Sequence, residues 1–396
     1  MSKVKLGDVM TLHRGYDLPN ARRIDGDVPI IGSSGVSGFH NVARLHGKNV
    51  ITGRYGTIGK VFYHDGPCWP LNTALYVEDF HGNNERYIVY LLEAILASPM
   101  INGGDKSTVP GVDRNALHAM EIPYIENHDE QDLIANVLSS IDDKIALSKK
   151  MMAELEDTAR LIYDYWFTQF DFPDENGKPY RSSGGKMVYS KTLKREIPEG
   201  WEAGLMSDLG SVVSGATPST GDSSNYADEG IAWITPNDLS DNDSFMHISH
   251  GKRDVSGVGL ASCSAVMMPA GSTIMSSRAP IGYLAVAETA CCTNQGCKSL
   301  VADAGYPSYF NFFTVQRLMP LIRSQGAGTT FAEVSKEDFA SVRLARPPKG
   351  MAERFEKSVL PLCEKSKRLQ TETVELSSLR DWLLPMLMNG QVSISG

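Results

Sequence analysis

The segment "GRYGTIGK" places charged and aromatic side chains among glycines. Its Arg54, Tyr55 and Lys60 lie in or beside a turn whose glycines let the backbone approach a partner closely. An arginine guanidinium can donate to both acceptors that guanine presents in the major groove of DNA. These residues therefore predict a surface that contacts DNA.

A second segment, "SSRAPIG", has the same character and contains Ser276, Ser277 and Arg278. Asparagine and glutamine can pair with adenine, and hydroxyl or lysine side chains can contact phosphates and bases. Further candidates of these types lie in neighbouring loops: Ser33, Ser34, Asn72, Lys106, Ser107, Thr108, Asn294, Gln295, Thr329 and Thr330. Any one of them could instead be a solvated loop or a structural turn. The prediction of DNA contacts depends on their recurrence in two halves of the chain.

Catalytic motifs are absent from the sequence. It contains no phosphate-binding G-x-x-x-x-G-K-[ST] loop, no G-x-G-x-x-G dinucleotide turn and no HExxH zinc helix. The segment "ARPPKG" lacks the flanks of an amino-methyltransferase loop, and "PDENGKP" lacks the acidic trio of a nuclease. The six cysteines form no CxxC pair and are interpreted as reduced structural thiols. We therefore expect no catalytic residue and no metal in this chain.

The chain repeats an order of features, as loop insertions into a duplicated domain would leave it. "GRYGTIGKVFY" is matched by "SSRAPIGYLAV", which pairs Arg54 with Arg278 and leaves one residue fewer before Ile-Gly. "LNTAL" is matched by "TNQGC", and Gly15 falls opposite Gly215. Short runs rich in Val, Ile, Thr and Tyr, bounded by turn residues, predict twisted β-sheet in both halves. A short helix is predicted at "ERYIVYLLEAIL".

Each half ends in a long helical pattern whose apolar residues step alternately by four and three, the spacing of a coiled-coil seam. Pro361 is expected to begin or kink the second helix. Each helix spans on the order of 50 Å, too long to be buried on one small domain. The alternative is that each packs only on its own half. The predicted seam residues are Ile134, Leu138, Ile141, Ile145, Met152, Leu155, Ile162, Phe355, Val359, Leu362, Leu369, Leu376 and Leu383.

Composition limits the class of protein. At 396 residues the chain is too long for one ordinary domain. No apolar run is long enough to span a membrane and the start resembles no signal peptide, so a cytoplasmic protein is expected. The net charge is -9, but residues 125–164 contain 10 acidic and 4 basic residues. Much of the acidic excess therefore lies on the first helix, and the rest of the first half could still present a basic face.

The predicted fold is α+β, with two pseudo-repeated globular domains of mainly twisted β-sheet and short helices, each followed by a long helix. Residues 1–125 form the first globular domain and 126–168 the central helix. The polar, turn-rich residues 169–200 are interpreted as a linker, 201–348 as the second globular domain and 349–396 as the C-terminal helix. The two helices are predicted to pack as an antiparallel coiled coil.

The sequence resembles the specificity (S) subunit of type I restriction-modification enzymes. The similar segments are "IPYIENHDEQDLIANVLSSIDDKI", "YDYWFTQFDF", "LKREIPEGW" and "LLPMLMNGQVSI", and their order covers essentially the whole chain. One departure is visible in "PPKGMAERFEKSV", which lacks the Glu-Gln pair that opens the first helix.

The resemblance implies two target recognition domains, each of which reads one half of a split, asymmetric site in double-stranded DNA. The helices would set the unread gap between the half-sites and dock two modification subunits, which use S-adenosylmethionine to methylate adenine. Two motor-nuclease restriction subunits, which use ATP and Mg²⁺, would complete the enzyme. The S subunit itself is expected to be non-catalytic and to bind no cofactor.

Three other interpretations remain open from the sequence. The chain could be an enzyme with a bipartite recognition half, which would bind S-adenosylmethionine by itself. It could be a coiled-coil scaffold with two protein-binding β domains, or a stand-alone DNA-binding protein. Steeply salt-dependent DNA affinity would distinguish a DNA reader from a scaffold.

Overall fold

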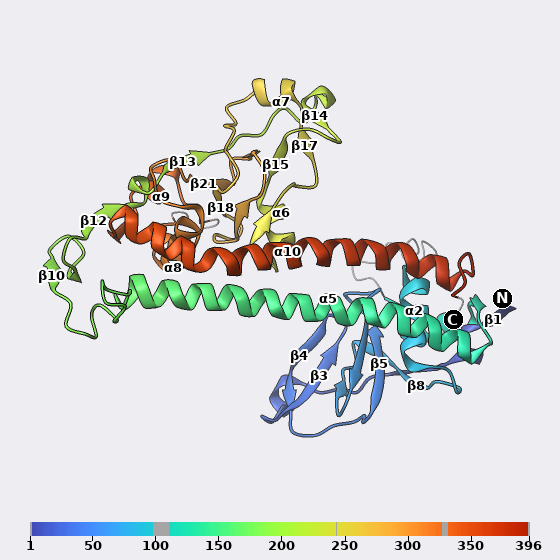
Figure 1. The fold of residues 1–396 in the computed structure, drawn as a ribbon. Helices are drawn as coiled ribbons and strands as arrows, with labels where there is room; N and C mark the ends of the chain where they lie inside the picture. The colour runs from blue at the N-terminus through green and yellow to red at the C-terminus, as the bar shows by residue number, and fades with distance from the viewer. Residues whose placement is uncertain (1, 98–110, 243, 327–331, 395–396) are drawn as a thin grey trace. The chain divides into compact units, whose positions relative to one another are not determined.

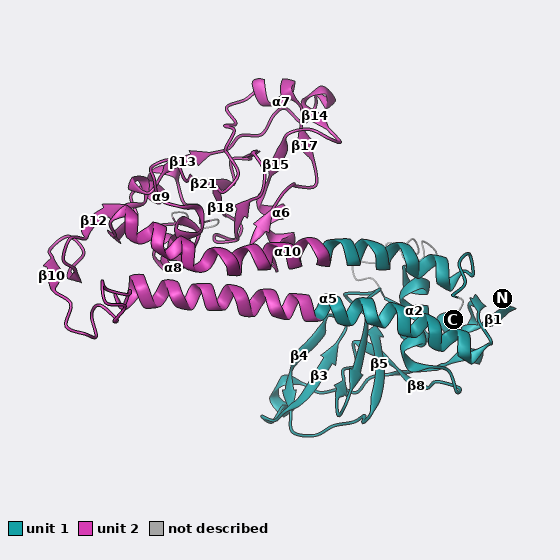
Figure 2. Cartoon of the chain, in the orientation of Figure 1, with its two compact units in different colours: residues 1–146, 374–396 teal, residues 147–373 magenta. Residues whose placement is uncertain are grey.

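The computed structural model describes residues 2–97, 111–242, 244–326 and 332–394. The chain divides into two compact units. Unit 1 consists of residues 1–146 and 374–396, and unit 2 of residues 147–373 (Figure 2). Within the described residues no helix is long and apolar enough to cross a membrane.

Unit 1 is built on an antiparallel sheet of four strands in the order β2-β8-β5-β6. These strands are β2 (Thr11–Arg14), β8 (Ala74–Asp79), β5 (Lys48–Gly53) and β6 (Val61–Asp65). A second sheet has the order β4-β3-β7, in which β3 and β7 run parallel. Its strands are β4 (Gly35–His40), β3 (Val28–Gly32) and β7 (Trp69–Pro70).

Helix α2 (Glu85–Leu96) supplies much of the core of unit 1, as its apolar pattern predicts. Asn84 caps it by accepting a hydrogen bond from Tyr87 N. The smaller elements are η1 (Asn20–Arg22), α1 (Leu6–Val9), α4 (Arg114–Ala119) and the antiparallel ribbon of β1 (Ser2–Lys5) and β9 (Glu121–Tyr124).

Unit 2 is built on a sheet in the order β13-β21-β18-β19-β16. Its strands are β13 (Ser211–Ser214), β21 (Cys297–Val301), β18 (Thr273–Ser276), β19 (Leu284–Ala287) and β16 (His247–Ile248). The paired ribbons are parallel β15 (Ala232–Ile234) with β20 (Cys291–Thr293), antiparallel β12 (Glu202–Leu205) with β22 (Arg343–Arg346), and antiparallel β14 (Tyr226–Ala227) with β17 (Asp254–Val255). The helices are η3 (Met206–Asp208), η4 (Ser223–Asn225), α6 (Pro236–Asp241), α7 (Gly257–Ala261), α8 (Ser308–Ser324) and α9 (Lys336–Ala340).

The two units repeat one topology, which confirms the predicted α+β fold. The order β13-β21-β18-β19 in unit 2 corresponds to β2-β8-β5-β6 in unit 1. Both units also pair the strand before their first helix with the strand before their long helix, β1 with β9 and β12 with β22. A Cβ added at Gly15 would lie 2.1 Å from Leu71 O, and one added at Gly215 would lie 1.9 Å from Thr293 O. The same close approach of two backbone segments therefore requires glycine in both units.

The long helices are α5 (His128–Tyr163) and α10 (Lys349–Met388), and each contributes to both units. In unit 1 the start of α5 and the end of α10 share one core, which contains Ile134, Leu138 and Leu387. In unit 2 the end of α5 and the start of α10 share another core, and Ser366 Oγ donates to Glu156 Oε1 at 2.7 Å. The helices therefore pair in antiparallel directions (Figure 1).

All predicted seam positions are buried or half-buried. The buried ones are Ile134, Leu138, Met152, Phe355, Val359 and Leu369, and the half-buried ones are Ile141, Ile145, Leu155, Ile162, Leu362, Leu376 and Leu383. Pro361 does not begin the second helix, because α10 starts at Lys349 and continues through it. Pro361 is exposed, so the backbone carbonyl that loses its amide partner there can be hydrated.

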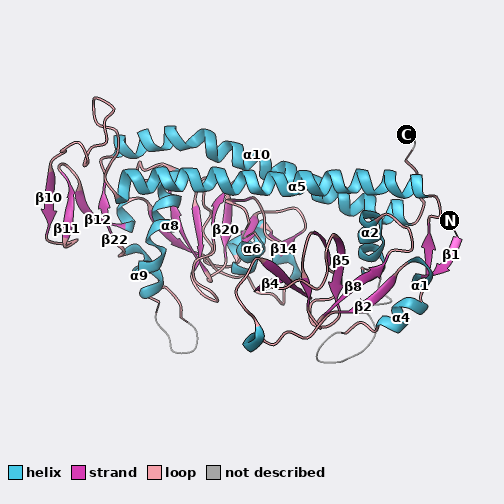
Figure 3. Cartoon of the chain, turned by 90° about the horizontal axis from the view of Figure 1, so that it is seen from below, coloured by secondary structure: helices cyan, strands magenta, loops and turns pink. Residues whose placement is uncertain are grey.

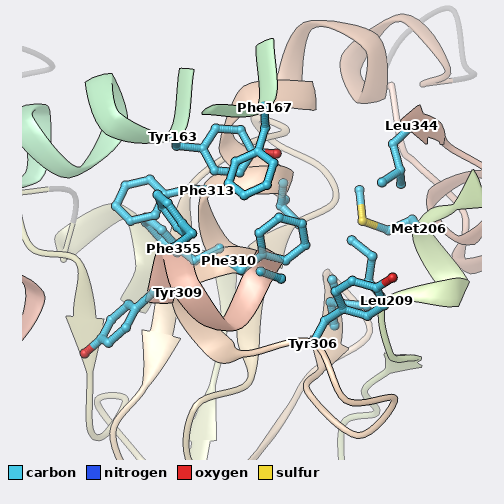
Figure 4. Close-up of a cluster of buried hydrophobic side chains, with 14 of the residues drawn as sticks. Tyr163, Phe167, Met206, Leu209, Tyr306, Tyr309, Phe310, Phe313, Leu344 and Phe355 are labelled. Atoms are coloured by element: carbon cyan, nitrogen blue, oxygen red, sulfur yellow. The ribbon is translucent and has the colours of Figure 1, made fainter. Parts of the chain in front are cut away.

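Aromatic side chains fill the core of unit 2 (Figure 4). Phe167 lies after α5, Phe310 and Phe313 lie on α8, and Phe355 lies on α10. The ring centroids of Phe167 and Phe310 are 5.0 Å apart, and those of Phe167 and Phe355 are 5.2 Å apart. Each such pair contributes about 0.5–1.5 kcal/mol beyond area burial. This cluster joins α5, α8 and α10 within unit 2.

The polar residues 169–200 are a folded part of unit 2. They follow the π-helical turn η2 (Asp164–Thr168) and contain the antiparallel hairpin of β10 (Met187–Ser190) and β11 (Arg195–Pro198). Phe172 is buried in this segment and stacks on Trp201 with ring centroids 5.6 Å apart. The polar composition of the segment predicted a linker. The segment folds because a few aromatic residues provide its packing.

Candidate nucleic-acid interface

Three loops meet at one end of the four-stranded sheet of unit 1, whose strands β2, β8 and β5 are labelled in Figure 3. Arg54 N and Tyr55 N both donate to Thr73 O, at 2.8 and 3.2 Å, which joins the loop after β5 to the loop before β8. A Cβ added at Gly53 would lie 3.2 Å from Ser33 Cβ, so the β3–β4 turn lies against the same loop. Ser33 is half-buried and Ser34 is exposed in that turn. The structure therefore brings Ser33, Ser34, Arg54, Tyr55 and Asn72 to neighbouring loops.

The Arg54 guanidinium lies over the Tyr55 ring, 4.6 Å from its centroid. This cation–π contact is worth about 0.5–1 kcal/mol at an exposed site and restricts the arginine. Tyr55 is 45% exposed and Lys60 is also exposed, so the loop presents a flat ring and two cations to solvent. Gly56 and Gly59 have φ of 83° and 90°, which lets the loop turn back so sharply.

Asn72 is held by the carboxylate of Asp17. Its Nδ2 donates to Asp17 Oδ1, and Arg14 Nη2 lies 3.0 Å from the same oxygen. Asn72 is half-buried, so its amide is oriented by the protein before any ligand arrives.

Ser276 and Ser277 are fully buried in unit 2, so in this structure they do not form part of a ligand-contacting surface. Ser276 Oγ donates to Pro280 O at 2.8 Å and accepts from the amides of Gly282 and Tyr283. Ser277 Oγ donates to Gly296 O at 3.1 Å. We therefore assign both hydroxyls to bracing the loop that carries Arg278.

Arg278 is half-exposed and lies in the loop after β18, as expected. Its Nη1 is 3.6 Å from Glu333 Oε2. Asn294 Oδ1 accepts from Gly296 N at 2.9 Å, and exposed Gln295 accepts a hydrogen bond from Thr217 Oγ1 at 2.5 Å through Oε1. A Cβ added at Gly296 would lie 3.3 Å from Arg278 Nε, so Arg278, Asn294 and Gln295 form one group.

Backbone hydrogen bonds correct the pairing of Arg54 with Arg278. Arg54 N donates to Thr73 O and Val112 N donates to Arg54 O. In unit 2 the corresponding bonds belong to Ser277, whose N donates to Gly296 O and whose O accepts from Val334 N. Arg278 therefore occupies the backbone position of Tyr55.

Local geometry agrees with this shifted register. Tyr55 forms an isolated bridge with Gly111, and Arg278 forms one with Glu333. Positive φ occurs at Gly56 and Gly59 in unit 1 and at Ala279 and Gly282 in unit 2, at the same spacing. The two loops thus match without a gap. The sequence comparison paired Arg278 with Arg54, one residue away from its structural equivalent, Tyr55.

Some predicted contacts lie outside the described residues: Lys106, Ser107, Thr108, Thr329 and Thr330. Sequence reasoning also missed Lys298 and Glu333, which contact each other and the Arg278 loop. Lys298 could have been found from the repeat, because it is a charged residue in β21 at the position that Leu75 occupies in β8.

The described residues contain no group of three or more His, Cys, Asp or Glu side chains that could hold a metal ion. All six cysteines are free. Burial raises the pKa of Cys68 and of Cys292 to about 11, and that of Cys291 to about 12. These thiols are protonated at neutral pH and are poor ligands and nucleophiles.

The model of the type I restriction modification DNA specificity domain matches this chain twice, over residues 1–157 and 198–354. The chain belongs to this family. The match confirms the resemblance seen in the sequence and the prediction of a DNA specificity protein.

The chain is also similar to named specificity subunits of type I restriction enzymes. The type I restriction enzyme MjaIX specificity subunit of Methanocaldococcus jannaschii is 32% identical over 161 residues, 40% of this chain and 37% of that protein. The HindI specificity subunit of Haemophilus influenzae is 23% identical over 342 residues, 74% of this chain and 73% of that protein. The crystal structure of a type I S subunit from M. genitalium superposes with a TM-score of 0.63 at 15% identity, covering 98% of this chain and 95% of that chain. That likeness supports the fold.

Proposed function

We propose that this specificity-family chain directs a type I restriction-modification enzyme to a split DNA site, with each unit reading one half. The observation that carries the proposal is the contrast at one backbone position of the repeated fold. Unit 1 presents Tyr55 there with Arg54 stacked on it, and unit 2 presents Arg278 beside Glu333. A common frame with unlike side chains fits two unlike half-sites.

The long helices are proposed to dock two modification subunits. Leu161 on α5 is 61% exposed and Trp382 on α10 is 55% exposed. Both lie at the same distance from the start of their helix, so the repeat places one large apolar side chain at each of two equivalent positions. A single exposed apolar residue is ordinary on a protein surface, so it is the recurrence at equivalent positions that favours a protein partner here. Two equivalent positions fit two copies of one partner.

The remaining parts of the proposal concern the assembled enzyme. The chain itself contributes no catalytic group. The modification subunits use S-adenosylmethionine to methylate adenine, and two restriction subunits use ATP and Mg²⁺. The helix pair sets the number of unread base pairs between the half-sites.

The test is to co-purify the chain with its modification subunit and to map adenine methylation on genomic DNA. We expect one split motif, methylated once on each strand. A complex that methylates without sequence preference, or methylates a continuous motif, would contradict the proposal. The chain alone should bind DNA with steep salt dependence, whereas a protein scaffold should not.

A further inference from the structure

A buried lysine lies beneath the loop that carries Arg278. The Lys298 side chain is 6% exposed, and its Nζ is 3.5 Å from Glu333 Oε1. The ammonium also donates to Ser277 Oγ at 3.2 Å and to Gln295 O at 3.0 Å. The other carboxylate oxygen of Glu333 lies 3.6 Å from Arg278 Nη1. Glu333 thus connects the buried ammonium to the half-exposed guanidinium.

The fold does not need these three charges. Lys298 and Leu75 occupy equivalent positions of the repeated sheet. Lys298 pairs with Met275 of β18 in unit 2, and Leu75 pairs with Thr52 of β5 in unit 1. Leu75 is fully buried, Gly111 occupies the position of Glu333, and Tyr55 that of Arg278. Burying an ammonium where leucine suffices is unfavourable unless polar partners compensate for lost hydration. Packing alone therefore does not explain the charge of Lys298.

We infer that Lys298 and Glu333 are positioning residues that hold Arg278 to read a guanine in the second half-site. This inference rests on the proposed DNA-reading function and names how one base is selected. A guanidinium has five N–H donors, so an ion pair at Nη1 is compatible with bidentate donation to guanine O6 and N7. Restricting the side chain before binding lowers the entropy lost on binding.

Lys298 has a second effect in this arrangement. An isolated carboxylate beside a DNA-reading loop would repel phosphates. The neighbouring ammonium offsets the charge of Glu333, so the carboxylate can orient Arg278 without weakening the approach of DNA. Glu333 alone would not provide both properties.

The experiment uses the complex with modification subunits and measures methylation of the mapped site and of sites with one base pair changed. Arg278→Ala should reduce discrimination at one guanine of the second half-site by roughly 5- to 150-fold. Lys298→Met and Glu333→Gln should each reduce discrimination at that same base pair by roughly 3- to 30-fold. Discrimination at the first half-site should be unchanged in both variants. Glu337→Gln, the same substitution at an exposed position of α9, should have no effect.

Thermal unfolding distinguishes a positioning role from a merely structural one, because a structural role would lower stability together with base discrimination. Lys298→Met should leave the stability of unit 2 unchanged or higher while base discrimination falls. Two outcomes overturn the inference and leave the proposed function intact. One is that Lys298→Met and Glu333→Gln lower methylation equally at all sites. The other is that both keep full discrimination while Arg278→Ala loses it. A new base preference in Glu333→Gln also overturns it, because Glu333 would then read the base itself. A wild-type complex without discrimination overturns the proposed function instead.

Discussion

Arg380 on α10 donates through Nη1 to Asp142 Oδ1 on α5 at 3.2 Å within unit 1. Asp142 Oδ2 also accepts from Tyr90 OH at 2.7 Å, so one carboxylate joins α2, α5 and α10. Arg380 follows the four-three spacing of the apolar seam, where a charge is unfavourable unless it is paired. The ion pair explains how the coiled coil accepts it.

Breaking this pair should loosen unit 1. Arg380→Ala should cost about 1–2 kcal/mol, between the values for exposed and buried pairs, because both side chains are about 30% exposed. Hydrogen exchange of the α2 and β5 amides measures unit 1 separately from unit 2. Arg368→Ala, at an exposed position of α10, is the control. Equal protection in Arg380→Ala and the wild type would show that the pair contributes nothing to unit 1.

A carboxyl beside this pair should make unit 1 less stable at neutral and alkaline pH than at acidic pH. Burial raises the pKa of Glu93 to about 7, the Arg380 charge partly opposes this, and Asp142 and Asp381 add to it. Because the folded pKa lies above the unfolded one, stability is fully present below about pH 4.5 and falls as pH rises through 7. Glu93→Gln should remove this loss, on the order of 2 kcal/mol at pH 8. The measurement is urea unfolding at pH 5 and pH 8, with exposed Glu121→Gln as the control. A wild-type stability that does not fall over this range would contradict the prediction.

Leu161 and Trp382, two of the exposed apolar residues of the long helices, should each hold one modification subunit. Leu161→Asp and Trp382→Asp should each reduce the bound subunits from two to one, because burying a carboxylate in an apolar interface is strongly unfavourable. Analytical ultracentrifugation of the co-purified complex gives the number. Lys149→Asp and Lys365→Asp, at exposed positions of the same helices, should keep two. Two subunits bound in all four variants would place the docking surface elsewhere.

Arg54 should act on the first half-site alone. Arg54→Ala should reduce discrimination there by about 1–3 kcal/mol, as expected for a lost bidentate base contact, and leave the second half-site unchanged. Lys60→Ala provides the comparison, since loss of a phosphate contact weakens binding to all sequences alike and lowers the salt dependence. A uniform loss of affinity in Arg54→Ala would identify Arg54 as a phosphate contact.

Lengthening the helix pair should lengthen the gap in the recognised site. Because α5 and α10 pair in antiparallel directions, one heptad is inserted after Ser148 and another after Gln370, which keeps the seam in phase. Seven residues add about 10 Å, or roughly three base pairs of DNA. Methylation mapping should find the same half-sites with the longer gap. An unchanged gap would rule out the helices as the spacer.

The sequence was sufficient for the parts of the fold that depend on periodic burial. Four-three spacing located the seam, and short β-branched runs located the repeated sheets, because both patterns recur along the chain. The segment 169–200 was harder, since two or three aromatic residues such as Phe172 outweigh a mostly polar composition.

The candidate interface depends on contacts that no local pattern records. The one-residue offset between Arg54 and Arg278 is set by hydrogen bonds to Thr73 and Gly296, which are distant in the chain. A serine at the end of a strand can face solvent or bond nearby backbone with equal ease, and Ser276 does the latter. Lys298 appeared as an ordinary charged residue because its burial depends on three partners from other loops.

Unit 2 is a continuous stretch of chain, residues 147–373, whose ends both lie within long helices. A gene encoding such a chain can exchange that stretch with a related gene by two recombination events in helix-coding DNA. The seam positions at the junctions would keep their spacing, so the hybrid would retain its core. On the proposed function, one such exchange would replace half of the DNA target in a single generation and leave the other half unaltered.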